Sequence, residues 1–155
     1  MRIAYATSGK GPPLLKVGNW LSHLEFDLTS PVWGHVLEML SSEHTLVRYD
    51  QRGTGLSDRD VEQVSFALWL QDLETVIDAA GPERFPMPAI SQGVSLAIAY
   101  TARHPERVSH LVLHGGYARG RLVRNPTPDQ RGEAEMMRKL AQLGRGMQDT
   151  ASRHV

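Results

Sequence analysis

Residues 85–100, FPMPAISQGVSLAIAY, decide the fold because they place a short apolar strand directly before a helix of small residues. Ser91 stands at the junction. A serine on a sharp strand-to-helix turn is the layout of a nucleophile elbow, which exposes the hydroxyl and offers the helix N-terminus to an oxyanion. Side chains two positions before and after the serine nearly collide in such a turn, so the small residues Ala89 and Gly93 support it. The alternative is that Ser91 only caps the helix.

The composition is that of an ordinary globular chain with one domain. At 155 residues, the sequence is long enough to bury a single core. Its 17 basic and 17 acidic side chains cancel, so we expect neither a nucleic acid nor an anionic membrane as a partner. The lack of cysteine excludes disulfides and thiolate metal sites. No apolar run approaches the length of a membrane span, and we expect a cytoplasmic protein.

Apolar runs of strand length alternate with helix-periodic segments, which predicts an α/β layer architecture. We expect strands at residues 2–6, 14–17, 46–50, 87–90 and 111–114. Helices are expected at residues 31–40, from Ser65 as N-cap to Gly81, at residues 93–103, and from the capping box at residues 127–130 to about Leu143. Gly144 should end this last helix, followed by a frayed tail.

Two segments resemble enzymes of the α/β-hydrolase fold. Residues 47–58, VRYDQRGTGLSD, look like the segment after the fourth strand of that fold, and residues 89–121 look like its elbow, following helix and sixth strand. Most closely they resemble bacterial hydrolase modules sometimes joined to regulator or cyclase domains. The resemblance implies a partial fold that is incomplete at both ends, with a mostly parallel five-stranded sheet flanked by helices. It implies a core over residues 1–120, and the start of a helical lid with a tail over residues 121–155.

The resemblance also assigns roles to individual residues. Ser91 matches the nucleophile, and the Gln92 amide matches one donor of the oxyanion hole. The second donor lies in the loop VGNW at residues 17–20, where the Trp20 amide is favoured and Asn19 is the alternative. Val94 departs from the family, which often has a second glycine there.

The glycine-punctuated turn at residues 53–55 does not predict a nucleotide site. A dinucleotide fingerprint would need a further glycine where Asp58 stands, and no Gly-Lys-Ser/Thr follows a glycine loop. Instead, Asp50, Arg52 and Ser57 are expected to form a hydrogen-bonded turn behind the site. The histidines do not cluster as metal ligands, so we expect no metal and no cofactor.

The acid and the base that should follow Ser91 are difficult to find. The fold orders its triad as serine, acid, histidine. Two histidines are the least unsuitable bases: His114 at the end of the last strand, and His154 in the tail. Asp129 is the nearest plausible acid, but it belongs to the capping box. We therefore expect a truncated chain that lacks the acid and histidine of its family.

Two hypotheses about function follow. The first is a serine hydrolase that cleaves a carboxylic ester or related acyl bond of a small molecule through an acyl-enzyme on Ser91. The alternative is a non-catalytic hydrolase-like module that binds a small ligand or a partner chain. The apolar strand HLVLH at residues 110–114 would be an open sheet edge, so we expect a homo-oligomer or a second chain that supplies the missing strands.

Overall fold

The computed structural model describes residues 1–20 and 22–151 of the chain. It divides into two compact units, Met1–Ala118 and Arg119–Val155. The first unit holds the strands and α1 to α4, and the second holds η1 (Arg121–Val123) and α5 (Pro128–Ala151). None of the described helices has the length and apolar character needed to cross a membrane.

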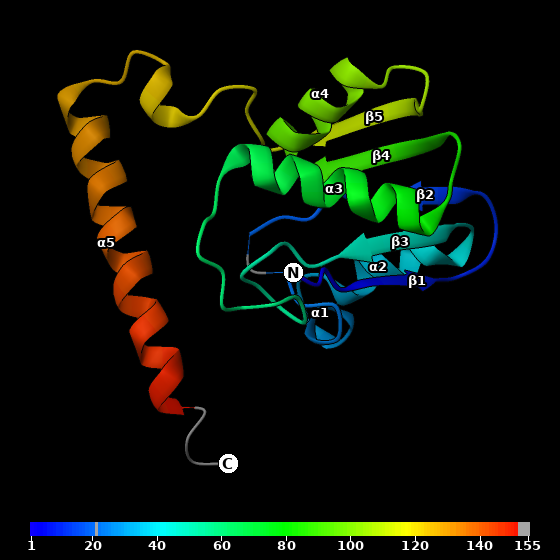
Figure 1. Ribbon diagram of the computed structural model, residues 1–155, viewed down its shortest axis with the longest axis horizontal. Helices are drawn as coiled ribbons and strands as arrows, with labels where there is room; N and C mark the ends of the chain where they lie inside the picture. Colours follow the sequence, from blue (N-terminus) through cyan, green and yellow to red (C-terminus); the bar gives the residue numbers. More distant parts are fainter. Residues whose placement is uncertain (21, 152–155) are drawn as a thin grey trace. The chain divides into compact units, whose positions relative to one another are not determined.

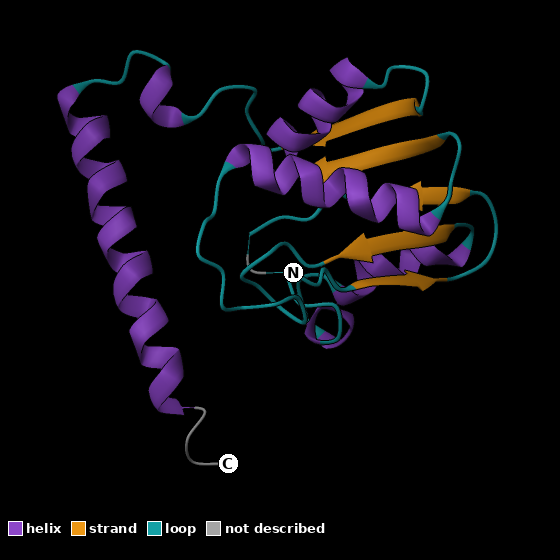
Figure 2. Cartoon of the chain, viewed as in Figure 1, coloured by secondary structure: helices purple, strands orange, loops and turns teal. Residues whose placement is uncertain are grey.

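The strands of the first unit form two small sheets (Figure 2). One has the order β1 (Tyr5–Ser8), β3 (Thr45–Tyr49), β2 (Pro13–Leu15), with β1 antiparallel and β2 parallel to β3. The other pairs β4 (Phe85–Ile90) with β5 (Val108–His114) in parallel. The α/β class and the mostly parallel pairing agree with the prediction, but the structure has two sheets where one continuous five-stranded sheet was expected.

Prolines in β4 explain the gap between the two sheets. The amides of Phe85 and Ser91 donate to carbonyls on the β5 side. Because successive backbone groups of a strand point to alternate sides, the even-numbered residues between them direct their N–H and C=O groups toward β2. Two of those residues are Pro86 and Pro88, which have no N–H to donate. The Pro88 carbonyl still accepts from the Val17 amide at 3.0 Å, just past β2. Among the residues that the structure describes, this is the one backbone hydrogen bond where a ladder between β2 and β4 would otherwise form.

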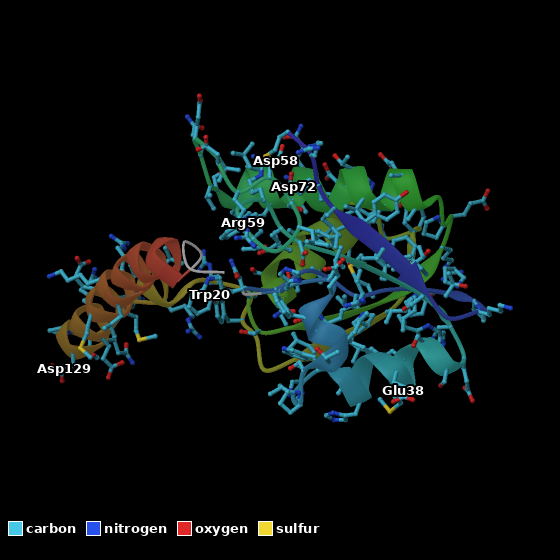
Figure 3. The ribbon with its side chains drawn as sticks, turned by 90° about the horizontal axis from the view of Figure 1, so that it is seen from below. Trp20, Glu38, Asp58, Arg59, Asp72 and Asp129 are labelled. Carbon is cyan, nitrogen blue, oxygen red and sulfur yellow. The ribbon has the colours of Figure 1, made fainter. Side chains whose placement is uncertain are left out.

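Helices cover both faces of the strands (Figures 1 and 3). The helices α3 (Phe66–Ala80) and α4 (Gly93–Arg103) lie on one face, and α2 (Gly34–Ser42) lies on the other beside the short α1 (Phe26–Thr29). The main core is packed between α3, α4 and the strands, and includes Leu15, Val17, Tyr49, Leu73, Ile77, Phe85, Met87, Leu96 and Tyr100. A smaller cluster under α2 consists of Leu14, Leu37 and Leu46.

Two helices begin and end where the sequence predicted. In α3 the Ser65 hydroxyl accepts from the Leu68 amide at 3.2 Å, and Gly81 closes the helix with a φ of 76°. The bounds of α4 are those expected. The first strand was placed too early, because the backbone of Arg2 bonds to Asp58 and not to a neighbouring strand. The expected helix at residues 31–40 begins only at Gly34 and continues to Ser42, and α1 was not foreseen.

The capping box at the start of α5 is confirmed. The Thr127 amide donates to Gln130 Oε1 at 3.1 Å, and the Gln130 amide donates to Thr127 Oγ1 at 3.3 Å. The expected end at Gly144 is wrong, since the helix continues to Ala151. A glycine inside a helix costs about 1 kcal/mol relative to alanine but does not by itself end the helix. Residues 152–155 of the expected tail lie outside the described residues.

Candidate active site

Ser91 occupies a sharp turn between β4 and α4. Its φ of 53° lies in the left-handed region, which costs a residue with a side chain of order 1–3 kcal/mol. The backbone fixes the turn on both sides, because the Ser91 amide donates to the His114 carbonyl at 3.0 Å and the Ser91 carbonyl accepts from the Val94 amide at 3.2 Å. The side chain is exposed. A simple helix cap would not need this backbone geometry, whereas a nucleophile elbow does.

The small residues beside Ser91 are needed for packing. A Cβ on Gly93 would lie 2.9 Å from the Gly18 carbonyl oxygen and 3.3 Å from Val17 Cγ1, so the loop after β2 touches the start of α4. Ala89 is fully buried and pairs with Leu113 of β5. The structure therefore brings Ala89, Gly93 and the loop at residues 17–20 together around the turn.

A glycine on the far side of the turn accommodates Val94. Val94 is only 3% exposed. A Cβ on Gly116 would overlap Cβ and Cγ2 of Val94 and would lie 2.6 Å from the Ser91 carbonyl oxygen. Val94 carries a side chain where the family often has glycine, and the absence of a side chain at Gly116 leaves the space that it occupies. The sequence reading missed Gly116, although a Gly-Gly pair directly after a strand was a usable signal.

The loop that should supply the second oxyanion donor is held by side chains. Asn19 is 8% exposed, and its Oδ1 accepts from Lys16 Nζ at 2.7 Å while its Nδ2 donates to the Trp20 carbonyl at 3.2 Å. The Asn19 carbonyl accepts from the Ser22 amide at 3.3 Å. Gln92, the other expected donor, stands at the N-cap position of α4. Both expected donor segments therefore adjoin the turn that carries Ser91.

Asp50 connects this loop to the turn after β3. It is fully buried, and its carboxylate accepts from Ser22 Oγ at 2.9 Å, from the Leu24 amide at 3.1 Å and from the Leu56 amide at 2.9 Å. Ser57 Oγ donates to the Asp50 carbonyl at 2.6 Å. The expected hydrogen bonding of Asp50 and Ser57 within this turn is present.

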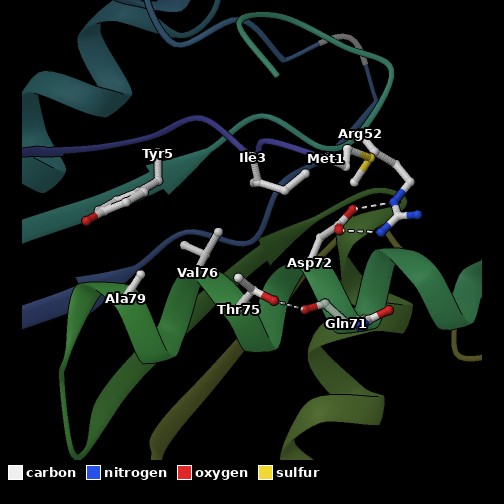
Figure 4. Close-up of a pocket in the computed structure, with 9 residues that line it drawn as sticks. All are labelled: Met1, Ile3, Tyr5, Arg52, Gln71, Asp72, Thr75, Val76 and Ala79. Atoms are coloured by element: carbon white, nitrogen blue, oxygen red, sulfur yellow. Dashed lines mark hydrogen bonds and ion pairs between the residues drawn. The ribbon is translucent and has the colours of Figure 1, made fainter. Parts of the chain in front are cut away.

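Arg52 does not join that turn as expected. Its guanidinium forms a bidentate pair with Asp72 of α3, with Nε to Oδ2 at 2.7 Å and Nη2 to Oδ1 at 2.5 Å. The hydrogen bond to Asp72 raises the pKa of the Arg52 guanidinium. Figure 4 shows the pair at the edge of a hollow that Ile3, Tyr5 and α3 also line. Neither this hollow nor a second one beside α2 is lined by Ser91.

Charged groups are buried beneath the loop. Lys16 is 7% exposed, and burial lowers its pKa to about 8, against the attraction of Asp27 and Asp50. Its ammonium lies 5.3 Å from the centre of the Trp33 ring. Burial also lowers the pKa of Arg48, which donates to the Leu24 carbonyl at 3.1 Å. The sequence reading passed over Lys16, although a lysine at the end of the apolar run PPLL was a signal.

The structure does not bring the candidate bases to the Ser91 hydroxyl. His114 contacts Ser91 through its backbone carbonyl, and its side chain is exposed. Among the described residues, no hydrogen bond joins a histidine to Ser91 Oγ. His154 lies outside the described residues, and Asp129 is exposed in the first turn of α5. The described part of the chain thus places the loop at residues 17–20 beside the Ser91 turn but places no histidine on the Ser91 hydroxyl.

Comparison with known proteins identifies the family. The sequence profile of the alpha/beta hydrolase fold matches residues 23–154. The chain belongs to the α/β hydrolase fold family. The chain is 28% identical over 126 residues to a pyrrolizixenacetamide deacetylase of Xenorhabdus hominickii, covering 81% of this chain and 46% of that protein. It is 36% identical over 111 residues to a pimeloyl-[acyl-carrier protein] methyl ester esterase of Nitrosomonas europaea, covering 72% of this chain and 40% of that protein.

Solved structures agree on the fold. A hydrolase from Pseudomonas aeruginosa superimposes with a TM-score of 0.68 at 22% identity, covering 89% of this chain and 48% of that one. The chain thus spans less than half the length of these relatives. The resemblance inferred from the two sequence segments is confirmed as membership of the family.

Proposed function

We propose that this chain is the part of a serine hydrolase that carries the nucleophile, Ser91, and that it cleaves a carboxylic ester or related acyl bond of a small molecule. The observation that carries the proposal is the exposed serine with a φ of 53° at the β4–α4 turn. The two relatives, a deacetylase and a methyl ester esterase, support acyl bonds as the substrate class.

In the proposed reaction, Ser91 Oγ attacks the carbonyl carbon and the carbonyl oxygen becomes an oxyanion. The Gln92 amide and the amide of Trp20, or alternatively Asn19, would donate to that oxyanion. The C–O bond to the leaving group then breaks, and the alcohol departs with the proton that the Ser91 hydroxyl gave up. Water attacks the acyl-enzyme and releases the carboxylic acid.

The proposed reaction also needs a general base on the Ser91 hydroxyl. His114 and His154 are the candidates within the 155 residues, and the acid that would orient either of them is unassigned. Without a histidine on the Ser91 hydroxyl, the chain should acylate slowly and deacylate more slowly still, because loss of the base typically costs several powers of ten. A nitrophenyl ester should therefore give a burst of nitrophenolate equal to the enzyme concentration, followed by a stall.

Labelling with a fluorophosphonate tests the nucleophile directly. We expect one adduct, mapped to Ser91 by mass spectrometry, in the unmutated chain and in Ser109→Ala, which removes a half-buried serine of β5. Ser91→Ala should give none. An unlabelled Ser91 in a sample whose circular dichroism shows a folded chain would overturn the proposal.

A second candidate function is a non-catalytic module that binds a small ligand or a partner chain. The absence of a histidine on Ser91 Oγ among the described residues favours it. The two functions differ in the labelling experiment, because a binding module has no reason to hold an activated serine. This second function would be favoured if the folded, unmutated chain forms no fluorophosphonate adduct and Ser91→Ala gives the same result.

We also propose that the β5 edge pairs with another strand, in a homo-oligomer or with a second chain. Val112 is 57% and Leu113 is 45% exposed on this strand, which supports an apolar contact. A single monomeric peak in size-exclusion chromatography with light scattering would contradict the homo-oligomer.

We further propose that residues 121–155 form the start of a lid. A cytoplasmic location is likewise proposed, with the lack of cysteine as its support.

A further inference from the structure

A buried lysine that the proposed reaction does not use stands directly before the loop at residues 17–20. Lys16 follows β2 directly, and its amide continues the pairing with β3 by donating to the Val47 carbonyl at 3.0 Å. Its side chain lies inside the protein, where an ammonium group is costly unless it has a partner. The hydrogen-bond partner is Asn19 Oδ1, at 2.7 Å.

This hydrogen bond fixes the direction of the Asn19 amide group. An ammonium can only donate, so it must face the oxygen of the amide and not its nitrogen. The nitrogen is thereby turned toward the Trp20 carbonyl, to which it donates at 3.2 Å. A chain of two hydrogen bonds thus runs from Lys16 through Asn19 to the backbone of Trp20.

The backbone of the loop is held at the same place. The Asn19 carbonyl accepts from the Ser22 amide at 3.3 Å, which sets the plane of the peptide that carries the Trp20 N–H. The Gly18 carbonyl accepts from Gln51 Nε2 at 3.2 Å and lies against Gly93 at the start of α4. The segment that Lys16 orients is therefore the one that adjoins the Ser91 turn.

We propose that Lys16 is a positioning residue whose ammonium, through the Asn19 side chain, holds the Trp20 segment in the orientation that completes the oxyanion hole. This inference rests on the proposed function, because it assigns to Lys16 the control of a donor in that reaction. A neutral amine would release the constraint, since it can also accept a hydrogen bond and the Asn19 amide could then turn.

The charge state of Lys16 gives the proposal its signature. Burial and Arg48 of β3 disfavour the ammonium, whereas Asp27 of α1 and Asp50 after β3 favour it, and together they lower the pKa of Lys16 to about 8. The constraint should therefore be complete near neutral pH and be lost in mildly alkaline solution. A purely structural lysine would show no such dependence in the reactivity of Ser91.

The test measures the rate constant of fluorophosphonate adduct formation at Ser91, as a function of pH, in four proteins. These are the unmutated chain, Lys16→Met, Lys16→Arg and the control Lys10→Met, which removes an exposed lysine of the β1–β2 turn. We expect Lys16→Met to react about 10-fold more slowly at about pH 6.5, because a misplaced oxyanion donor loses much of its effect. The ratio should shrink to below about 2-fold at about pH 9.5, where only a few per cent of Lys16 keeps its proton. Lys10→Met should match the unmutated chain throughout.

Further variants and outcomes decide the proposal. Asn19→Leu should slow labelling as Lys16→Met does, and the double variant should be no slower than either single one. If Lys16→Met does not fold, Lys16→Arg is the deciding variant. Arginine keeps its charge, so the labelling rate constant of Lys16→Arg should increase relative to that of the unmutated chain as the pH rises. The role of Lys16 is overturned if Ser91 is labelled but the unmutated chain and Lys16→Met have equal rate constants. It is also overturned if the ratio of these two rate constants does not change with pH. No adduct in the unmutated chain overturns the proposed function and this inference with it.

Discussion

The contact between Gly116 and Val94 predicts a substitution that should distort the β4–α4 turn without replacing Ser91. In Gly116→Ala the new carbon would overlap two carbons of Val94 and would lie 2.6 Å from the Ser91 carbonyl oxygen. Overpacking of this kind costs about 1–3 kcal/mol, and we expect the upper half of that range because one of the opposing atoms belongs to the backbone. The shift of the Ser91 carbonyl should also slow fluorophosphonate labelling.

A comparison of double variants identifies the clash as the cause. Val94→Ala keeps the Cβ that the new carbon would overlap, so its cost and that of Gly116→Ala should add. Val94→Gly removes both overlapping carbons, and the double variant should be at least about 1 kcal/mol more stable than the sum of the single costs. The matched control is Gly115→Ala, where no atom lies within 4 Å but φ is 59°, so a backbone cost of about 1–2 kcal/mol should leave labelling unchanged.

Urea unfolding followed by circular dichroism gives the free energies, and mass spectrometry gives the labelling rates. The reasoning fails if Gly116→Ala unfolds within about 0.5 kcal/mol of the unmutated chain and labels at the same rate. It also fails if Val94→Ala and Val94→Gly rescue the variant equally, because the Cβ of Val94 would then not be the obstacle.

Three other predictions follow from the described contacts. Asp72→Leu should lower the free energy of unfolding by about 3–5 kcal/mol in urea titrations, because it strands the largely buried charge of Arg52, and Arg52→Met in the same chain should recover most of the loss. Between about pH 8 and 10.5, Lys16 binds fewer protons in the folded chain than in the unfolded chain. The free energy of unfolding should therefore rise with pH by roughly 3 kcal/mol over this range. The same titration of Lys16→Met should lack this rise. Ser65→Ala should lower the melting temperature through a loss of about 1 kcal/mol, since the Leu68 amide loses its cap, and an unchanged temperature would contradict that contribution.

Features of this fold that depend on neighbouring residues in sequence were predictable. The cap of Ser65, the closing glycine at position 81 and the capping box of α5 each rest on residues a few positions apart, and each is present. The sharp strand-to-helix turn at Ser91 belongs to the same class, because a strand, a serine and small residues follow one another directly. The end of α5 was not predictable in this way, since a glycine ends a helix only when the residues around it form a cap.

Features that depend on partners distant in sequence were not predictable. Arg52 pairs with a residue 20 positions away on α3, and Gly116 makes room for a valine on another element. The role of Lys16 depends on its burial, which the sequence alone does not state. The place of a general base has the same character, since it requires a side chain brought to Ser91 by tertiary structure.

The two prolines of β4 affect how firmly the backbone connects the two proposed donors of the oxyanion hole. The Gln92 amide lies just after β4, a strand of one sheet, whereas the Trp20 amide follows β2 in the other sheet. Between them, the described backbone has the single bond from Val17 to Pro88 where a full ladder would resist sliding. The spacing of the two proposed donors is therefore held by this one bond and by side-chain packing, because Leu15 of β2 and Met87 of β4 lie in the same buried core.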